Sequence, residues 1–367
     1  MDLATLLLRA SIRTDDVVNG GSSGSLYGSV VPNLAFNVAM LAIWGVLLGW
    51  HTIMFRYKQY WFSSAFVCAA ILQVLGYVGR VWGHFNLSLE TPFVMQQVCL
   101  TVAPVFTMRG VYYQLPKMIE IYGHQFSLLR SPIAYWYLLV AFDLIALPVQ
   151  AAGGAIAGTN LHQAEHILIA GFSLQVASMV MFMALLGHLY YKVFIQTRLD
   201  HSGQSKLTLS LLKISQTDID YLYRQKFSDL RIHPDRWVFR YFPVALVVAV
   251  ATVFVRCCYR LAVVASDWQG SLIKHENYFI ILDAVMVAMG TVALSIFHPG
   301  FAFQGTHVSI PITHGRIDPE TDTKPLLTPE DDEADINSGD KDSPLYKFVK
   351  RRRERIKKIF NLVYKLL

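Results

Sequence analysis

The sequence predicts an all-α membrane protein, a bundle of seven transmembrane helices with its N-terminus outside and its C-terminus in the cytoplasm. Three observations lead to this prediction: an apolar composition, the gathering of apolar residues into long stretches, and an alternation of positive charge between those stretches. Of the 367 residues, 54% are hydrophobic and only 16% are charged, which argues against a pair of soluble domains.

The apolar residues form seven stretches with few or no charged side chains. At a rise of about 1.5 Å per residue, each stretch can cross about 30 Å of hydrocarbon as a helix. Backbone amides find no water in lipid, so a spanning segment is either a helix or a strand of a closed barrel. These segments lack the alternating pattern of barrel strands and are therefore expected to be helices. The expected spans are residues 33–55, 62–82, 93–115, 133–157, 167–191, 241–265 and 279–297.

Lysine and arginine alternate between the connections. The first, third and fifth connections are basic, whereas residues 83–92 and 158–166 contain neither residue. Because lysine and arginine are retained in the cytoplasm, this pattern places residues 1–32 outside the cell as an extracellular segment. The one Asn-x-Ser/Thr sequence begins at Asn86 in the second connection, where this orientation allows glycosylation.

The C-terminal part changes its charge along the chain. Residues 300–345 are rich in acidic side chains and proline, which predicts a disordered cytoplasmic tail. Residues 346–367 are basic, with apolar side chains at helical spacing, and predict an amphipathic helix on anionic inner-leaflet lipids. A solvated run of charges with a trafficking role is the alternative for this segment.

Ionisable and amide side chains inside or beside the spans are the candidate functional residues. A charged side chain near the centre of a membrane helix costs at least about 2.5–3.5 kcal/mol, so it faces the interior, pairs or lines a wet path. Amide side chains also seek partners between helices. The candidate substrate path comprises Gln73, Arg80, Arg109, Asp143, Gln150, Gln175, Arg256, Arg260, Glu276 and Asp283.

Two explanations of these residues stay open. They form a polar cluster through which a substrate passes, or they are interhelical locks that only hold the bundle together. Arg256 and Arg260 lie four residues apart on one helical face, which favours a shared purpose such as an anionic head group or a carboxylate cluster.

The sequence motifs give little support to a catalytic function. The chain lacks the G-x-x-x-x-G-K-[ST] pattern of P-loop ATPases, and no nucleophile stands at a credible spacing from a base. Residues 162–166 match the H-x-x-E-H zinc protease pattern, but they occupy a short external connection without a soluble domain around it. We expect no enzyme, no catalytic residue, no metal, no cofactor and no nucleic-acid partner.

Short motifs are spread over residues 27–300, each weak alone and specific in combination. They are Tyr27-Gly28, Val31-Pro32, Gly76-Tyr77-Val78-Gly79-Arg80, Ala103-Pro104, Gln150-Ala151-Ala152-Gly153-Gly154, Ala170-Gly171-Phe172-Ser173-Leu174-Gln175, Arg256-x-x-Tyr259-Arg260, His275-Glu276, Asp283 and His298-Pro299-Gly300. Together they resemble the fungal RTA-like family, also called the lipid-translocating exporters. Members of that family are linked to 7-aminocholesterol resistance, sphingoid long-chain base release or porphyrin movement.

The resemblance implies a seven-helix transporter of amphipathic lipids or lipid-like toxic compounds in the plasma membrane, which confers export or resistance. Its partners would be membrane lipids or amphipathic small molecules. Family members usually carry an acidic residue at the position of Gln73 and commonly a glutamate at that of Val263. Without these partners for Arg80 and Arg260, the interior is expected to be more cationic, which favours an anionic or amphipathic head group.

A seven-helix sensor or regulator of membrane lipid or stress signalling fits the same orientation. In that case the fifth connection and the tail would engage cytoplasmic proteins, which the sequence does not identify. A sensor would recruit partners when a ligand binds, whereas a translocator would move lipid when purified into liposomes. A membrane organiser is the third possibility.

Overall fold

The computed structural model describes residues 31–57, 59–129, 131–156, 160–202, 215–232, 237–266, 272, 275–303, 310 and 312. The extracellular segment up to residue 30, the tail beyond residue 312 and the amphipathic helix at 346–367 lie outside these residues. The chain divides into two units, residues 1–322 and 323–367, and every described residue belongs to the first.

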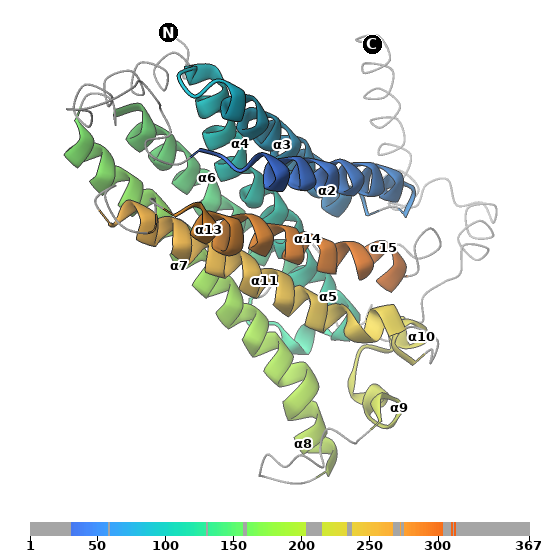
Figure 1. The fold of residues 1–367 in the computed structure, drawn as a ribbon. Coiled ribbons are helices and arrows are strands. Elements are labelled where there is room, and N and C mark those ends of the chain that lie inside the picture. The colour runs from blue at the N-terminus through green and yellow to red at the C-terminus, as the bar shows by residue number, and fades with distance from the viewer. Residues whose placement is uncertain are drawn as a thin grey trace, which may run out of the picture. The chain divides into compact units, whose positions relative to one another are not determined.

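Among the described residues, seven helices are long and apolar enough to cross a membrane, which confirms the predicted all-α bundle of seven spans. The spans consist of α2 (Leu34–Ile53), α3 (Tyr60–Phe85), α4 (Glu90–Tyr112) with α5 (Gln114–Tyr122), α6 (Pro132–Ile156), α7 (Leu161–Tyr190), α11 (Trp237–Val264), and α13 (Glu276–Phe279) with α14 (Met286–Ile296). Short helices follow at α8 (Thr197–Ser202), α9 (Gln216–Ile219), α10 (Ser228–Ile232) and α15 (Pro299–Ala302). Figure 1 shows the spans side by side, with α8, α9 and α10 at the end of the bundle opposite to α13.

The two ends of the bundle are named here after the predicted orientation, which stays a prediction. The outer end carries Asn33, Asn86 and Glu276, and the inner end carries Gly123 and His298. Asn86 is exposed where α3 ends, in the connection to α4, and its glycosylation stays a prediction too.

The third and fifth spans exceed their predicted lengths the most. The third runs over Glu90–Tyr122 and the fifth over His162–Ser202, 33 and 41 residues respectively. The predicted spans end near charged side chains, because a charge is expected to end a membrane helix. Lys117 is nevertheless buried within α5, where its Nζ donates a hydrogen bond to Oε1 of Gln59. A charge that finds a partner inside the protein need not end a helix.

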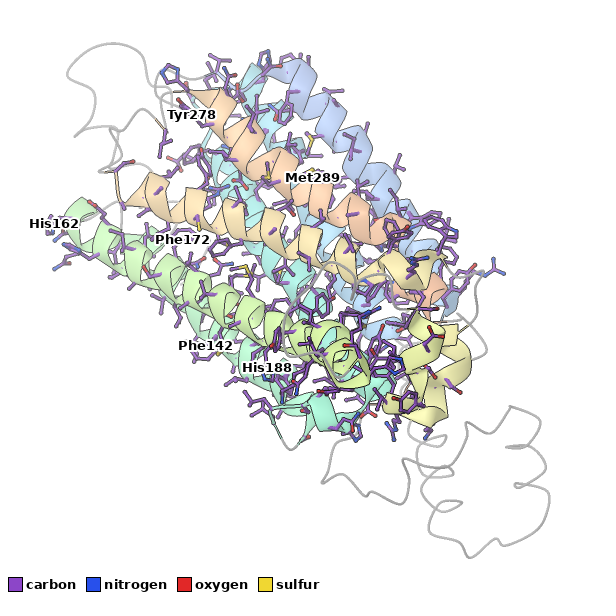
Figure 2. All side chains as sticks on the ribbon, turned by 90° about the horizontal axis from the view of Figure 1, so that it is seen from below. Phe142, His162, Phe172, His188, Tyr278 and Met289 are labelled. Carbon is purple, nitrogen blue, oxygen red and sulfur yellow. The ribbon has the colours of Figure 1, made fainter. Side chains whose placement is uncertain are left out.

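Large apolar side chains lie on the outside of the bundle as well as inside it. Val46 is 73% exposed and Leu144 is 63% exposed. Lipid tails are as apolar as leucine, so this surface suits a bilayer, whereas in water it would favour aggregation. Figure 2 shows the described side chains along the helices, with His162 at the exposed beginning of α7.

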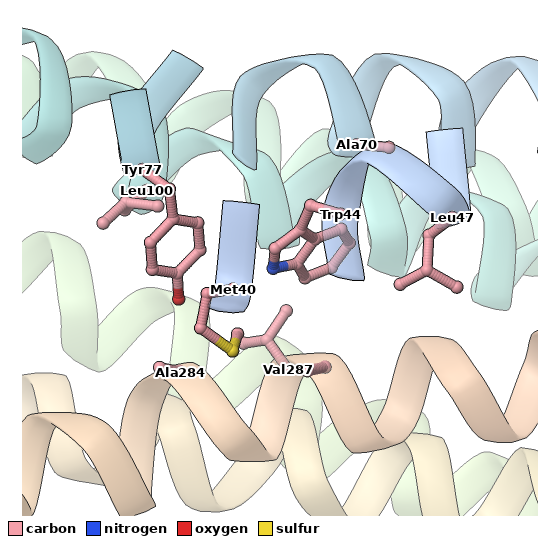
Figure 3. Close-up of a cluster of buried hydrophobic side chains, with 9 residues drawn as sticks. Met40, Trp44, Leu47, Ala70, Tyr77, Leu100, Ala284 and Val287 are labelled. Carbon is pink, nitrogen blue, oxygen red and sulfur yellow. The ribbon is translucent and has the colours of Figure 1, made fainter. Parts of the chain in front are cut away.

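A cluster of buried apolar side chains joins α2, α3, α4 and the last span (Figure 3). Trp44 is fully buried at its centre, and Tyr77 directs its hydroxyl toward the segment that carries Ala284. The cluster consists of Met40, Trp44, Leu47, Ala70, Tyr77, Leu100, Ala284, Val287 and Ala288.

Gly76 and Gly79 bring α3 and α4 into close contact. A Cβ atom at Gly79 would lie 2.9 Å from the carbonyl oxygen of Pro92 and 3.0 Å from the amide nitrogen of Gln96. Both atoms belong to the backbone of α4, so they cannot move aside as a flexible side chain can. Small residues allow such close helix packing in membranes, where dispersion contacts contribute much of the association.

Replacing Gly79 with alanine is therefore expected to destabilise the protein by about 1–3 kcal/mol, because the two helices must separate. Thermal unfolding of the purified protein in detergent, followed by size-exclusion chromatography, measures this effect. Gly49→Ala is the matched control, because nothing lies within 4 Å of a Cβ atom built at Gly49. An equal response of the two variants would contradict the close-packing argument.

Candidate functional site

The last span presents three side chains to the bundle at the outer end: Glu276, Phe279 and Asp283. They are three and four residues apart, which places them along one side of a helix. Residues Ile280–Val285 form a π-helical segment, a local widening that is frequent at functional sites. These side chains meet arginines from α3 and α11.

Glu276 connects the beginning of α2 to α3. Its carboxylate accepts hydrogen bonds from the backbone amide of Asn33, at 3.1 and 3.0 Å, and forms an ion pair with Arg80. Arg80 also donates from Nε to Oδ1 of Asn37 at 2.8 Å and from Nη1 to Oε1 of Gln96 at 3.4 Å. One arginine therefore contacts polar groups on α2, α4 and α13.

Asp283 forms ion pairs with two arginines on α11. Nε of Arg256 lies 2.9 Å from Oδ1, and Arg260 pairs with Oδ2 through Nη2. Nη2 of Arg256 also donates to the carbonyl oxygen of Leu100 at 2.9 Å. Leu100 lies four residues before Pro104, which has no N–H to occupy that carbonyl, so the proline supplies an acceptor for the arginine.

Phe279 links the two ion-paired groups. Cζ of Arg80 lies 4.3 Å from the centre of the Phe279 ring, and Cζ of Arg260 lies 5.8 Å from it, both within cation–π range. We call Arg80, Arg256, Arg260, Glu276, Phe279 and Asp283 the outer charged network. It holds three guanidinium groups and two carboxylates, so with all of them ionised it retains one positive charge.

Three of the other predicted path residues lie between α6 and α7. Nε2 of Gln150 donates to Oε1 of Gln175 at 3.1 Å, and both side chains are buried. Asp143 is buried two turns earlier on α6 and interacts with the hydroxyls of Tyr112 and Ser178. These polar groups are separate from the ion pairs of the outer charged network.

Arg109 and Gln73 also lie apart from the ion pairs. Arg109 is in the last turn of α4, toward the inner end, where its Cζ lies 5.8 Å from the ring centre of Trp61 and 5.5 Å from that of Trp136. Gln73 is buried on α3 and belongs to no ion pair among the described residues. The set predicted as one path is thus divided into separate groups.

The argument for a more cationic interior does not hold for Arg80 and Arg260. Gln73 and Val263 supply no carboxylate, but Glu276 and Asp283 pair with these two arginines instead. Arg109, which was counted toward the excess of positive charge, lies at the aromatic rings near the inner end. The outer charged network still retains one positive charge, so the preference for an anionic or amphipathic head group stays a hypothesis.

Sequence reasoning missed several polar partners. Asn37 and Gln96 bind Arg80, although Asn37 was visible as a polar residue in an apolar stretch. At the inner end, Glu120 pairs with Arg224 at 2.7 Å and with His124 at 2.9 Å, and Arg231 pairs with Asp220 at 2.7 Å. The sequence showed the two arginines only as loop charges.

The fold and the buried ion pairs define a seven-helix integral membrane protein with a charged interior near its outer end. The chain belongs to the RTA1-like family, because the family model described as "RTA1 like protein" matches residues 66–306. This match agrees with the family resemblance of the sequence motifs.

Three relatives from Saccharomyces cerevisiae illustrate the family. The chain is 53% identical over 321 residues to the Sphingoid long-chain base transporter RSB1 of strain ATCC 204508 / S288c, covering 86% of this chain and 83% of that protein. It is 22% identical to Protoporphyrin uptake protein 1, covering 63% and 66% of the two chains. It is 20% identical to Protein RTM1, covering 64% and 67%. No solved structure matches the chain.

Proposed function

We propose that this protein moves sphingoid long-chain bases across the plasma membrane. The observation that carries the proposal is 53% identity, over 86% of this chain, to a protein named a sphingoid long-chain base transporter. The similarity favours transport over the alternative of a lipid sensor. A long-chain base is an amphipath with a basic head group, so its passage needs polar groups at membrane depth.

The arrangement of the bundle supports such a passage. Polar side chains between α6 and α7 lie within membrane-spanning helices, and the outer charged network contacts α2 and α4 near one end of the bundle. A head group that crosses the membrane meets a lower barrier where side chains replace its water. We assign the network's ion pairs to holding the helices together around that route.

Reconstitution tests the proposal directly. Purified protein in liposomes is expected to move labelled sphinganine between leaflets faster than protein-free liposomes or liposomes with an unrelated seven-helix protein do. The recovered lipid is expected to be chemically unchanged, since we propose transport without catalysis. Equal rates in all three preparations would overturn the transport proposal, and saturable binding without movement would favour the sensor.

A further inference from the structure

One buried carboxyl group lacks the partner that the others have. Four carboxyl groups are buried among the described residues. Glu120 pairs with Arg224, Asp220 with Arg231, and Asp283 with two arginines. Asp143 is only 4% exposed, yet no basic side chain pairs with it in the described part of the chain.

Among the described residues, hydroxyl oxygen atoms and no paired cation surround the carboxyl group of Asp143. Its carboxyl group interacts with the hydroxyls of Tyr112 on α4 and Ser178 on α7, and the two hydroxyl oxygens lie 3.5 Å apart. Its Oδ1 atom has no hydrogen-bond partner among the described residues. Cys257 on α11 is a further titratable group near this site among the described residues.

A carboxylate at this depth is costly unless a positive charge compensates it. Asp143 lies near the middle of α6, about equally far from both ends of this membrane-spanning helix. The arginines of the outer charged network are already bound to Asp283 and Glu276. The carboxyl group of Asp143 is therefore either protonated or compensated by a positive charge from outside the described side chains.

We propose that Asp143, Tyr112 and Ser178 bind the primary ammonium group of the long-chain base during its passage. The inference rests on the proposed function and assigns its head-group site. An ammonium group has three N–H donors, and this site offers a carboxylate and two hydroxyl oxygens as acceptors. Bound ammonium also neutralises the carboxylate.

The position of the site suits an amphipath. Leu144 and Ile145, next to Asp143 on α6, are 63% and 58% exposed on the lipid-facing surface. The alkyl chain can stay in lipid while only the head group passes beside α6. About 10 Å along the same helix, two turns away, Gln150 and its partner Gln175 on α7 offer amide groups to the hydroxyls of the base.

Binding of labelled sphinganine to the purified protein in lipid nanodiscs tests this assignment, with N-acetylsphinganine as the uncharged counterpart. Asp143→Asn is expected to weaken sphinganine binding about tenfold or more, as the loss of a charge-assisted hydrogen bond does. Its binding of N-acetylsphinganine is expected to change less than about twofold. Glu165→Gln, which makes the same change at a less buried carboxyl group at the beginning of α7, is expected to leave both affinities unchanged.

The outcomes separate this inference from the proposed function. If wild-type protein transports sphinganine and Asp143→Asn binds it as tightly as wild type, the assignment is wrong and the transport proposal stands. Loss of transport with unchanged affinity for sphinganine would assign Asp143 to proton transfer alone and would also overturn the ammonium site. If Asp143→Asn does not fold, Ser178→Ala decides, with a selective loss of sphinganine affinity expected and equal loss of both ligands contradicting the site.

Discussion

Asp283→Asn is expected to destabilise the protein by about 3–5 kcal/mol, the usual cost of removing one partner from a buried ion pair. Asp283 is the shared carboxylate of Arg256 and Arg260, and the Arg256 side chain is fully buried. Asparagine keeps the size of the side chain but leaves two buried guanidinium groups without a counter-charge. Thermal unfolding in detergent and protein abundance in isolated membranes measure the effect.

Asp200→Asn is the matched control, because Asp200 is exposed on α8 and its replacement should change stability by less than about 0.5 kcal/mol. Glu276→Gln is expected to fall between the two. Arg80 keeps its hydrogen bonds to Asn37 and Gln96 in that variant. If Asp283→Asn unfolds at the wild-type temperature, the ion pairs of α11 do not hold the last span in place.

Arg231→Ala is expected to release the segment at residues 215–232 from the inner end of the bundle. The guanidinium group of Arg231 donates to both carboxylate oxygens of Asp220, at 2.7 and 3.2 Å, and to the carbonyl oxygens of Ile121 and Arg224, at 2.5 and 2.8 Å. The contact with Ile121 ties the fifth connection to the end of α5, and the contacts with Asp220 and Arg224 hold the connection itself together. Their loss should raise the population of molecules in which this segment is locally unfolded. The rate of proteolytic cleavage within 215–232 should therefore rise about tenfold or more.

Limited proteolysis of the purified protein, with the cleavage sites identified by mass spectrometry, measures this release. Arg240→Ala serves as the control, since Arg240 is exposed and its described contact is with the ring of Tyr241 at 6.0 Å. Its cleavage rate should match that of wild type. A cleavage pattern of Arg231→Ala that equals the control would mean that other contacts hold the segment.

The number and approximate positions of the spans could be predicted because lipid imposes a local rule. A helix must satisfy its own backbone and remain apolar over a fixed length, and both properties are visible in one stretch of sequence. The rule is weaker at the ends of spans. The third span continues through Lys117 because this side chain bonds to Gln59, which is distant in the sequence. The fifth span continues past Tyr191, where the hydroxyl of Thr197 bonds to the backbone carbonyl of Lys192 in the neighbouring turn.

The candidate site was predictable as a set of residue types but not as an arrangement. The cost of burying charge identifies Arg80, Arg256, Arg260 and Asp283 without knowledge of the fold. The partner of Arg80 could not be chosen in advance, because Glu276 is 196 residues away in the chain. The same holds for Arg256, whose acceptor at Leu100 exists only because Pro104 leaves that carbonyl without an N–H.

The sequence by itself determined that this protein is a seven-helix bundle with ionisable side chains at membrane depth, since both properties depend on the solvation of local segments. Only the tertiary structure decided which charges neutralise one another. It paired Arg224 and Arg231 with buried carboxylates, whereas Asp143 lies among hydroxyl groups with no cation paired to it in the described part of the chain. Electrostatic compensation depends on distances between helices, and hydropathy along the chain does not contain those distances.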